Sequence, residues 1–235
     1  MIGWIDATIA AGARASLTPA TVHLVMRAQE DETVRRAVLH TTLAVPDGQP
    51  LVWALHALGH RGATRVYGPD LMAAFCEHAA ARGIPAYLYG GRSEEALVEL
   101  TVSLRTRFRG LQIAGGHAPP FGETSAEEDE RAAQRIERSG AQVVWIGIGQ
   151  PRQEVWMARM RERLSAPMLI AVGAAFDFHA GLVPQAPAWM GRHGLEWSYR
   201  LAREPRRLWR RYLRYNPRFV AAFARQYVAA RRAGH

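Results

Sequence analysis

A single carboxylate, Asp47, stands on a turn between two apolar segments in the stretch VPDGQPLVW, residues 45–53. Pro-Asp-Gly is common as an ordinary turn, which is one interpretation of this stretch. A carboxylate that a turn exposes to a pocket could instead act as a general base. The apolar neighbours Val45, Leu51 and Trp53 would raise its pKa and favour that role. The sequence therefore makes Asp47 a candidate base.

A second candidate site lies in the segment GIGQPRQEVWM, residues 147–157. Gly147 and Gly149 end a predicted strand, and Gln153 and Glu154 stand at the start of a predicted helix. Glycines let a ligand approach the backbone closely, and the N–H groups of a helix N-terminus attract anions. The third glycine of the dinucleotide-binding fingerprint is missing, so a plain strand–helix turn is an alternative. The polar side chains directly after the turn favour a binding site.

Asp177 follows another predicted strand, in the segment VGAAFDFHAG of residues 172–181. A carboxylate there can accept hydrogen bonds from a nucleobase or a ribose. His179 is a weaker candidate, because a single histidine is more often a hydrogen-bonded packing residue. The sequence holds neither a P-loop nor an Asp-x-Asp pair of the kind that binds a divalent ion on a nucleotide diphosphate. We therefore expect no metal site and no cofactor.

The positive charge of the chain is concentrated at its C-terminal end. Residues 200–235 hold eleven arginines and one acid, whereas residues 1–199 carry a net charge of −1. Such a segment suits a phosphate-rich partner: a diphosphate ligand, an anionic membrane or a nucleic acid. Arg200, Arg207 and Arg210 would share one face of a helix if that helix is unbroken. Together they could bind a diphosphate, although a solvated basic helix explains the pattern as well.

Short apolar runs alternate with longer helical patterns along the chain. The predicted strands are 63–68, 85–91, 111–116, 141–149 and 167–176, and the predicted helices are 70–82, 93–108, 125–139 and 151–165. The alternation is typical of an α/β protein with a Rossmann-like, mostly parallel sheet covered by helices on both faces. Ligands of such sheets bind beyond the carboxyl ends of the strands, so we look for the site there.

The two ends of the chain are predicted separately. Residues 21–39 read as one amphipathic helix. Residues 1–199 are expected to form the α/β core, and residues 200–235 a basic helical appendage that Pro217 interrupts.

Composition favours a cytoplasmic setting. The chain has no run of about 18 uncharged apolar residues, and its first residues lack the basic segment of a signal peptide. Cys76 is the only cysteine, which fits a reducing compartment.

Five motifs together, in their order along the chain, resemble the WecG/TagA/CpsF glycosyltransferases. They are PDGQPLVW, RVYGPDLM, GIGQPRQEVWM, VGAAFDFHAG and APAWMGRHGLEWSYRLAREPRRLWRRY. The resemblance covers residues 20–217 and is closest to members that build exopolysaccharides. It implies an inverting, metal-independent transfer of a ManNAc-, ManNAcA- or GlcA-type sugar. The donor would be a UDP-sugar, and the acceptor an undecaprenyl-diphosphate-linked saccharide on the inner face of the cell membrane.

The resemblance also implies roles for residues of the core. Asp47 matches the family's proposed base, and Arg65 and Gln153 match residues that line the pocket. The family carries a Thr-x-Asn-like segment that contacts the sugar. Here the corresponding stretch is TPATVH, without an asparagine, so Thr18 and Thr21 are both candidates.

The resemblance gives the C-terminal segment a role as well. Arg200, Arg207 and Arg210 match arginines that are thought to close over the active site and stabilise the leaving diphosphate. Asp177 is the candidate contact to uracil. Aromatic side chains interleaved with arginine also suit an anionic membrane surface, where the lipid-linked acceptor resides.

Two other classes of protein are alternatives at this point. A nucleotide-binding oxidoreductase could use a similar sheet, but the full glycine fingerprint is missing. A nucleic-acid-binding protein could use the basic segment, but the neutral core argues against it, and we expect no nucleic-acid partner. A homo-oligomer in which the C-terminal segment completes a neighbour's site is also compatible with the sequence.

Overall fold

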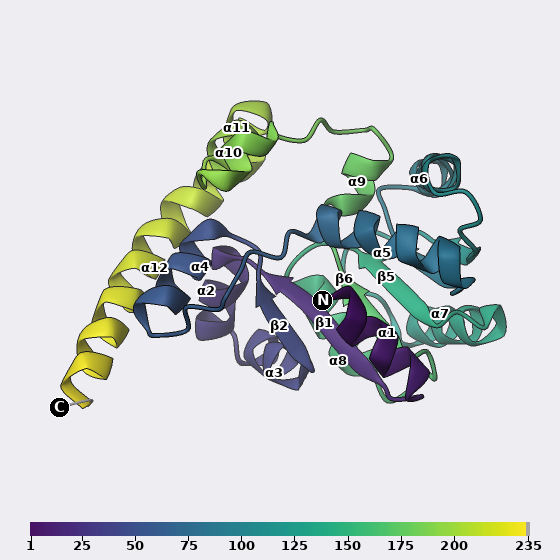
Figure 1. Cartoon of the computed structure of the whole chain (residues 1–235), viewed down its shortest axis with the longest axis horizontal. Helices are drawn as coiled ribbons and strands as arrows, with labels where there is room; N and C mark the ends of the chain where they lie inside the picture. The colour runs from purple at the N-terminus through teal and green to yellow at the C-terminus, as the bar shows by residue number, and fades with distance from the viewer. Residues whose placement is uncertain (234–235) are drawn as a thin grey trace.

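The computed structural model describes residues 1–233, except for the side chains of Ala188, Arg192, Arg207 and Ala233. Within this range six parallel strands form one sheet in the order β2-β1-β6-β5-β3-β4. The strands are β1 (Ala15–Ala20), β2 (Leu43–Pro46), β3 (Ala86–Gly90), β4 (Ile113–His117), β5 (Val143–Gly147) and β6 (Met168–Ala171). The prediction of an α/β fold with a parallel sheet is confirmed (Figure 1).

Helices cover both faces of the sheet because the strands are apolar on both sides. Successive side chains of β5 show this: Val143 and Trp145 join one buried cluster, and Val144 and Ile146 join the other. The first face packs against α1 (Ile2–Ala10), α5 (Gly68–Arg82), α6 (Glu94–Arg107) and α9 (Ala175–His179). The second packs against α7 (Ala126–Ser139) and α8 (Arg152–Met160), with α2 (Val22–Glu30) and α3 (Glu32–His40) beside α8.

The first part of the sheet differs from the prediction. The prediction of a strand at 63–68 is wrong. This segment joins β2 through one backbone hydrogen bond, from Val66 N–H to the Pro46 carbonyl at 2.8 Å, and Gly68 already begins α5. The central strand β1 was not predicted, because Ser16, Thr18 and Pro19 interrupt its apolar pattern. Ser16 and Thr18 are nevertheless buried: Thr18 donates to the buried Glu154, and Ser16 Oγ accepts from the N–H of Thr42 just before β2.

The single helix expected over residues 21–39 is two helices, α2 and α3. Asp31 separates them, since its backbone is extended and its carboxylate accepts hydrogen bonds from the N–H groups of Thr33 and Val34 at 3.0 and 3.3 Å. Thr21 caps α2 in the same way, accepting from Leu24 N–H at 3.3 Å.

The C-terminal segment forms α10 (Ala188–Arg192), α11 (Glu196–Arg203) and α12 (Pro205–Ala233). The helix is interrupted at Glu204, between α11 and α12. Arg200 therefore lies on α11, and the prediction that it shares a continuous helix with Arg207 and Arg210 is wrong. The predicted interruption at Pro217 is also wrong. The boundary predicted between residues 199 and 200 falls inside α11 and stays a prediction.

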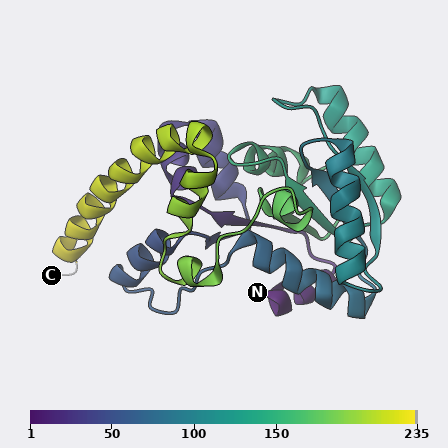
Figure 2. The ribbon, with the colours of Figure 1, turned by 90° about the horizontal axis from the view of Figure 1, so that it is seen from above.

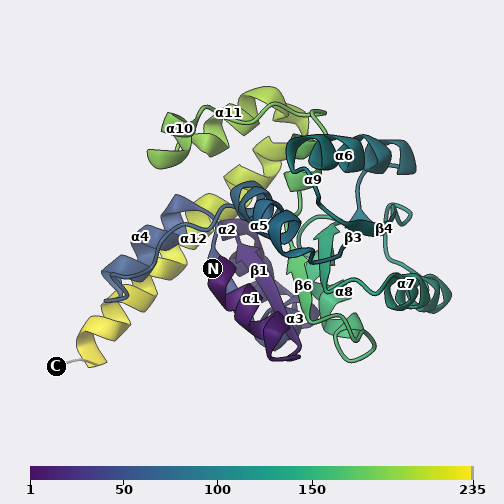
Figure 3. The ribbon, with the colours of Figure 1, turned by 45° about the vertical axis from the view of Figure 1, so that its right-hand side comes forward.

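Contacts on both sides of Pro217 explain why α12 continues through it. Arg214 donates to the Glu30 carboxylate at 3.0 Å, and Arg218 also binds Glu30, which fixes α12 on α2. Tyr215 is buried beside His23, with ring centroids 5.0 Å apart. The distal end of α12 extends well beyond the sheet in the views of Figures 2 and 3.

Candidate active site

The candidate site lies at the carboxyl edge of the sheet. Asp47 follows β2 directly, and its N–H donates to the carbonyl of Ala20 at the end of β1 (2.8 Å). Gly48 and Pro50 then start α4 (Gln49–Ala57), which begins at once because proline suits the first helical turn. The turn that contains Asp47 is thus held between a strand end and a helix start.

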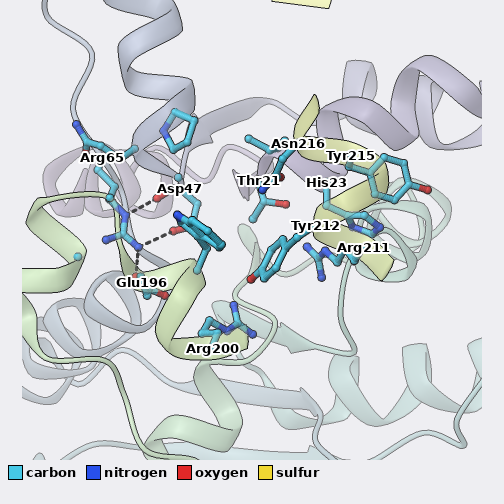
Figure 4. Close-up of a pocket in the computed structure, with 17 residues that line it drawn as sticks. Thr21, His23, Asp47, Arg65, Glu196, Arg200, Arg211, Tyr212, Tyr215 and Asn216 are labelled. Carbon is cyan, nitrogen blue, oxygen red and sulfur yellow. Dashed lines mark hydrogen bonds and ion pairs between the residues drawn. The ribbon is translucent and has the colours of Figure 1, made fainter. Parts of the chain in front are cut away.

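The C-terminal segment covers this edge. Asp47, Arg65 and Thr21 line one pocket with Glu196 and Arg200 of α11 (Figure 4). Further lining residues come from α2 and α12: His23, Arg211, Tyr212, Tyr215 and Asn216. The structure therefore brings the predicted base, the predicted pocket arginine and one predicted diphosphate-binding arginine together.

Arg65 lies between two carboxylates, those of Asp47 and Glu196 (Figure 4). Its Nε donates to the backbone carbonyl of Asp47, and its Nη2 donates to Glu196 Oε2 at 2.5 Å. The same Nη2 lies 3.6 Å from Asp47 Oδ1, within ion-pair range but beyond a hydrogen bond. The guanidinium also lies over the ring of Tyr67, 4.4 Å from its centroid.

The Asp47 carboxyl group is poised to exchange a proton near neutral pH. Burial raises its pKa to about 7; the charge of Arg65 opposes this shift, Glu196 adds to it, and Arg200 opposes it. Oδ1 is buried and accepts no hydrogen bond from any residue that the structure describes. The Asp47 side chain as a whole is 21% exposed and lines the pocket, and a carboxylate with such a pKa is suited to accept a proton from a substrate hydroxyl.

The two candidate threonines occupy different places. Thr18 is fully buried, and its hydroxyl donates to Glu154 Oε1 at 2.7 Å. Thr21 lines the pocket, and its hydroxyl donates to Gln150 Oε1 at 2.6 Å. Of the two, only Thr21 can touch a ligand in this pocket without a rearrangement of the core.

Gln153 and Glu154 lie in the core, and neither is among the described residues that line this pocket. Gln153 donates to Glu154 Oε1 at 3.0 Å, and both side chains are buried. Burial raises the pKa of Glu154, while hydrogen bonds from Thr18 and Gln153 oppose that shift. In the described part of the chain, Gln153 Oε1 and Glu154 Oε2 have no hydrogen-bond partner.

A wider cleft continues along the carboxyl ends of β3, β5 and β6. Its volume is about 920 Å³, and Gly147, Gly149 and Asp177 line it. Arg92 binds the two carboxylate oxygens of Asp177 at 2.9 and 3.0 Å. The Arg200 guanidinium lies 5.8 Å from the ring centroid of Phe178, the next residue after Asp177. Arg200 lines the Asp47 pocket, and its contact with Phe178 brings it near Asp177 of the cleft.

Of the other two predicted diphosphate-binding arginines, only Arg210 has a described side chain, and it lines neither cavity. Arg210 is exposed and lies 5.3 Å from the ring centroid of Trp209. The side chain of Arg207 lies outside the described residues. Two arginines that the sequence did not single out, Arg203 and Arg206, line the cleft instead.

Sequence reasoning also missed Glu196. The sequence does show an acidic residue at the start of the basic motif GLEWSYRLAREP. Residue spacing alone, however, cannot show that Glu196 contacts Arg65, which is 131 residues away in sequence. His179, the weaker candidate, contacts the carbonyl of Pro69 at 2.9 Å, and burial lowers its pKa. This environment fits a packing role.

Two kinds of feature are absent from residues 1–233 as far as they are described. Histidine, cysteine, aspartate and glutamate side chains do not gather there in groups of three that could hold a metal ion. Among the same residues, none of the helices combines the length and the apolar character that crossing a bilayer requires.

The chain was also compared with models of known protein families. The model of the glycosyl transferase WecG/TagA/CpsF family matches residues 1–233, nearly the whole chain. Members of this family use a sugar donor and an acceptor, which agrees with the presence of a pocket lined by Asp47 and of a second, wider cleft. On these grounds the chain belongs to the WecG/TagA/CpsF family and is a glycosyltransferase.

Proposed function

We propose that this glycosyltransferase moves a sugar from a UDP-sugar to an undecaprenyl-diphosphate-linked saccharide, with inversion at the anomeric carbon. The observation that carries the proposal is the Asp47 carboxyl group, which is 21% exposed, has its pKa raised to about 7 and lines a pocket that it shares with Arg200. A transferase with inversion needs one such base on the acceptor side and positive charge on the leaving-group side.

The wide cleft is the proposed donor site. Its volume of about 920 Å³ suits a nucleotide-sized ligand, and Gly147 and Gly149 allow the diphosphate to approach the backbone. Arg203 and Arg206 line it and supply positive charge. Asp177, together with Arg92, is placed to bind the uracil or the ribose. The sugar would then lie toward Arg200 and Asp47.

The proposed reaction is a single displacement. The acceptor hydroxyl attacks the anomeric carbon, Asp47 takes the hydroxyl proton, and the bond between that carbon and the UDP oxygen breaks. UDP leaves with the electron pair of that bond, and Arg200 stabilises the charge that develops on its diphosphate. Because arginine side chains supply this charge stabilisation, we propose that transfer does not require a metal ion.

A donor screen tests the proposed function. The protein is incubated with UDP-ManNAc, UDP-ManNAcA, UDP-GlcA or UDP-glucose and a short-chain polyprenyl-diphosphate-linked sugar, with and without EDTA. We expect UDP release and a product one sugar heavier with at least one of the first three donors, unchanged by EDTA. Stabilisation by NAD(P) or by DNA, with no effect of UDP or any UDP-sugar on the melting temperature, would contradict the proposal and favour one of the other two classes.

We also propose that the distal part of α12 contacts an anionic membrane surface on the cytoplasmic side, where a lipid-linked acceptor would be held. Phe219, Phe223 and Tyr227 are neighbours on this helix, with ring centroids 6.3 and 6.0 Å apart. Exposed arginines accompany them: Arg225, Arg231 and Arg232. Each basic residue near an anionic bilayer contributes about 1 kcal/mol.

Vesicle flotation tests this contact. Replacing the three arginines at 225, 231 and 232 with glutamine should weaken binding to phosphatidylglycerol-containing vesicles by about 10²-fold. The matched control replaces three exposed arginines of α7, at positions 131, 135 and 138, on the opposite side of the molecule (Figure 1). Equal losses in both variants would mean that only net charge matters, and that α12 is not the membrane contact.

A further inference from the structure

Glu196 has a place in the site that neither the motif pattern nor the family match assigns. We propose that Glu196 is a positioning residue that holds the Arg65 guanidinium away from the Asp47 carboxylate, so that this carboxylate stays free to take a proton. The inference rests on the proposed role of Asp47 as the base. It adds that α11, through Glu196, prepares that base when it covers the pocket.

The Arg65 guanidinium is bound to the Glu196 carboxylate more closely than to the Asp47 carboxylate. Its Nη2 is 2.5 Å from Glu196 Oε2 but 3.6 Å from Asp47 Oδ1, and its Nε is occupied by the backbone carbonyl of Asp47. The guanidinium is therefore fixed by two acceptors other than the Asp47 carboxylate. This arrangement explains how Oδ1 can be buried 3.6 Å from a guanidinium and still accept no hydrogen bond from the described residues.

The local sequence seats Glu196 against Arg65. A side chain at Gly191 would begin only 3.0 Å from Arg65 Nη1. Gly194 has a φ of +70°, and a Cβ there would lie 3.2 Å from Gln49 and 3.3 Å from Trp53, both on α4. Glycine at these positions lets the end of α10 approach Arg65, and the turn after it approach α4, closely. The Glu196 side chain is consequently only 15% exposed.

The charges around Asp47 come from several elements. Arg65 and Tyr67 precede α5, Glu196 and Arg200 lie on α11, and His23 and Arg211 line the same pocket from α2 and α12. The negative charge of Glu196 acts on Asp47 directly, since like charges disfavour ionisation. It also acts through Arg65, because without Glu196 the guanidinium can turn to the Asp47 carboxylate. Both effects make Asp47 a stronger base while Glu196 is in place.

A purely structural role for Glu196 is the competing explanation. In that case Glu196 would only tether α11, and its loss would reduce activity equally at every pH. Loss of a mere tether would leave the pKa of Asp47 unchanged, whereas loss of a positioning residue would lower it. The test therefore measures the pKa of Asp47 directly.

The test compares wild type with Glu196→Gln, Glu196→Asp and the control Glu162→Gln. Glu162 is an exposed acid paired with Arg14 at 3.3 Å, so its variant removes the same charge at a distance from the site. The titration of the Asp47 carboxyl is followed by NMR of protein labelled with ¹³C at the aspartate carboxyl groups, and Asp47→Asn assigns the signal. The pH profile of kcat/KM is recorded in parallel.

In Glu196→Gln we expect the Asp47 pKa to fall by about one unit or more, and the acidic limb of the pH profile to move to lower pH by the same amount. Glu196→Asp should lie between this variant and wild type, and Glu162→Gln should match wild type. An Asp47 pKa that stays near 7 in folded Glu196→Gln and Glu196→Asp would overturn the proposal. The NMR titration needs no substrate, so it decides this point even if the donor screen shows no transfer.

Discussion

Replacing Asp47 with asparagine is expected to lower kcat for sugar transfer by about 10²–10⁴-fold, the range that a positioned general base contributes. Asparagine has nearly the same shape but cannot take the acceptor proton. The affinity for UDP, measured by calorimetry, should stay within about twofold of wild type, since the proposed donor cleft is lined by other residues. Normal turnover in this variant would remove Asp47 from the mechanism.

The stability of the same variant is the control for its fold. The pKa of Asp47 is raised from 3.8 to about 7 in the folded protein, so the folded state keeps a proton that the unfolded chain releases between about pH 4 and pH 7. The free energy of unfolding of wild type therefore falls as pH rises through this window, by up to about 4 kcal/mol. Asp47→Asn should be more stable than wild type at pH 8, and the difference should vanish below pH 4. An inactive variant with this profile has lost chemistry and kept its fold.

Replacing Arg65 with alanine should give the second large effect, a loss of about 10²–10³-fold in kcat/KM. Without the guanidinium, the carboxylates of Asp47 and Glu196 face one pocket with no cation between them. The pKa of Asp47 should then rise further, so that the acidic limb of the pH profile moves to higher pH, opposite to the shift expected for Glu196→Gln.

Two variants check this interpretation of Arg65. Arg65→Lys should restore only part of the activity, because an ammonium group cannot bind the Asp47 carbonyl and the Glu196 carboxylate in the fixed geometry of the planar guanidinium. Arg61→Ala removes an exposed arginine four residues earlier and should behave like wild type. Activity in Arg65→Ala equal to that of Arg61→Ala would show that the guanidinium has no part in transfer.

The sequence was most informative where its apolar pattern was continuous. Strands β3, β5 and β6 lie within runs that are apolar on both faces, and the glycines that follow mark the edge where the site lies. Strand β1 escaped prediction because Thr18 is a polar residue whose partner, Glu154, comes from α8. A buried hydrogen bond between distant segments leaves no periodic signal in either of them.

The candidate site was predictable in its separate parts and less so in their assembly. Asp47 and Arg200 were singled out from motifs, and the structure places both at one pocket. Glu196 could not be found in this way, because it meets Arg65 only when α11 covers the end of β2. Arg210, by contrast, was singled out from its helical spacing but does not line the pocket. The interruption at Glu204 places it on a different helix from Arg200, and its side chain is exposed.

A crystal structure of Asp47→Asn with an intact UDP-sugar bound would test the central claim most directly. The account predicts that the nucleotide lies in the cleft beside Asp177, that the diphosphate contacts Arg200, and that the anomeric carbon faces the side chain at position 47. A donor bound outside that cleft, or with its anomeric carbon turned away from position 47, would contradict it.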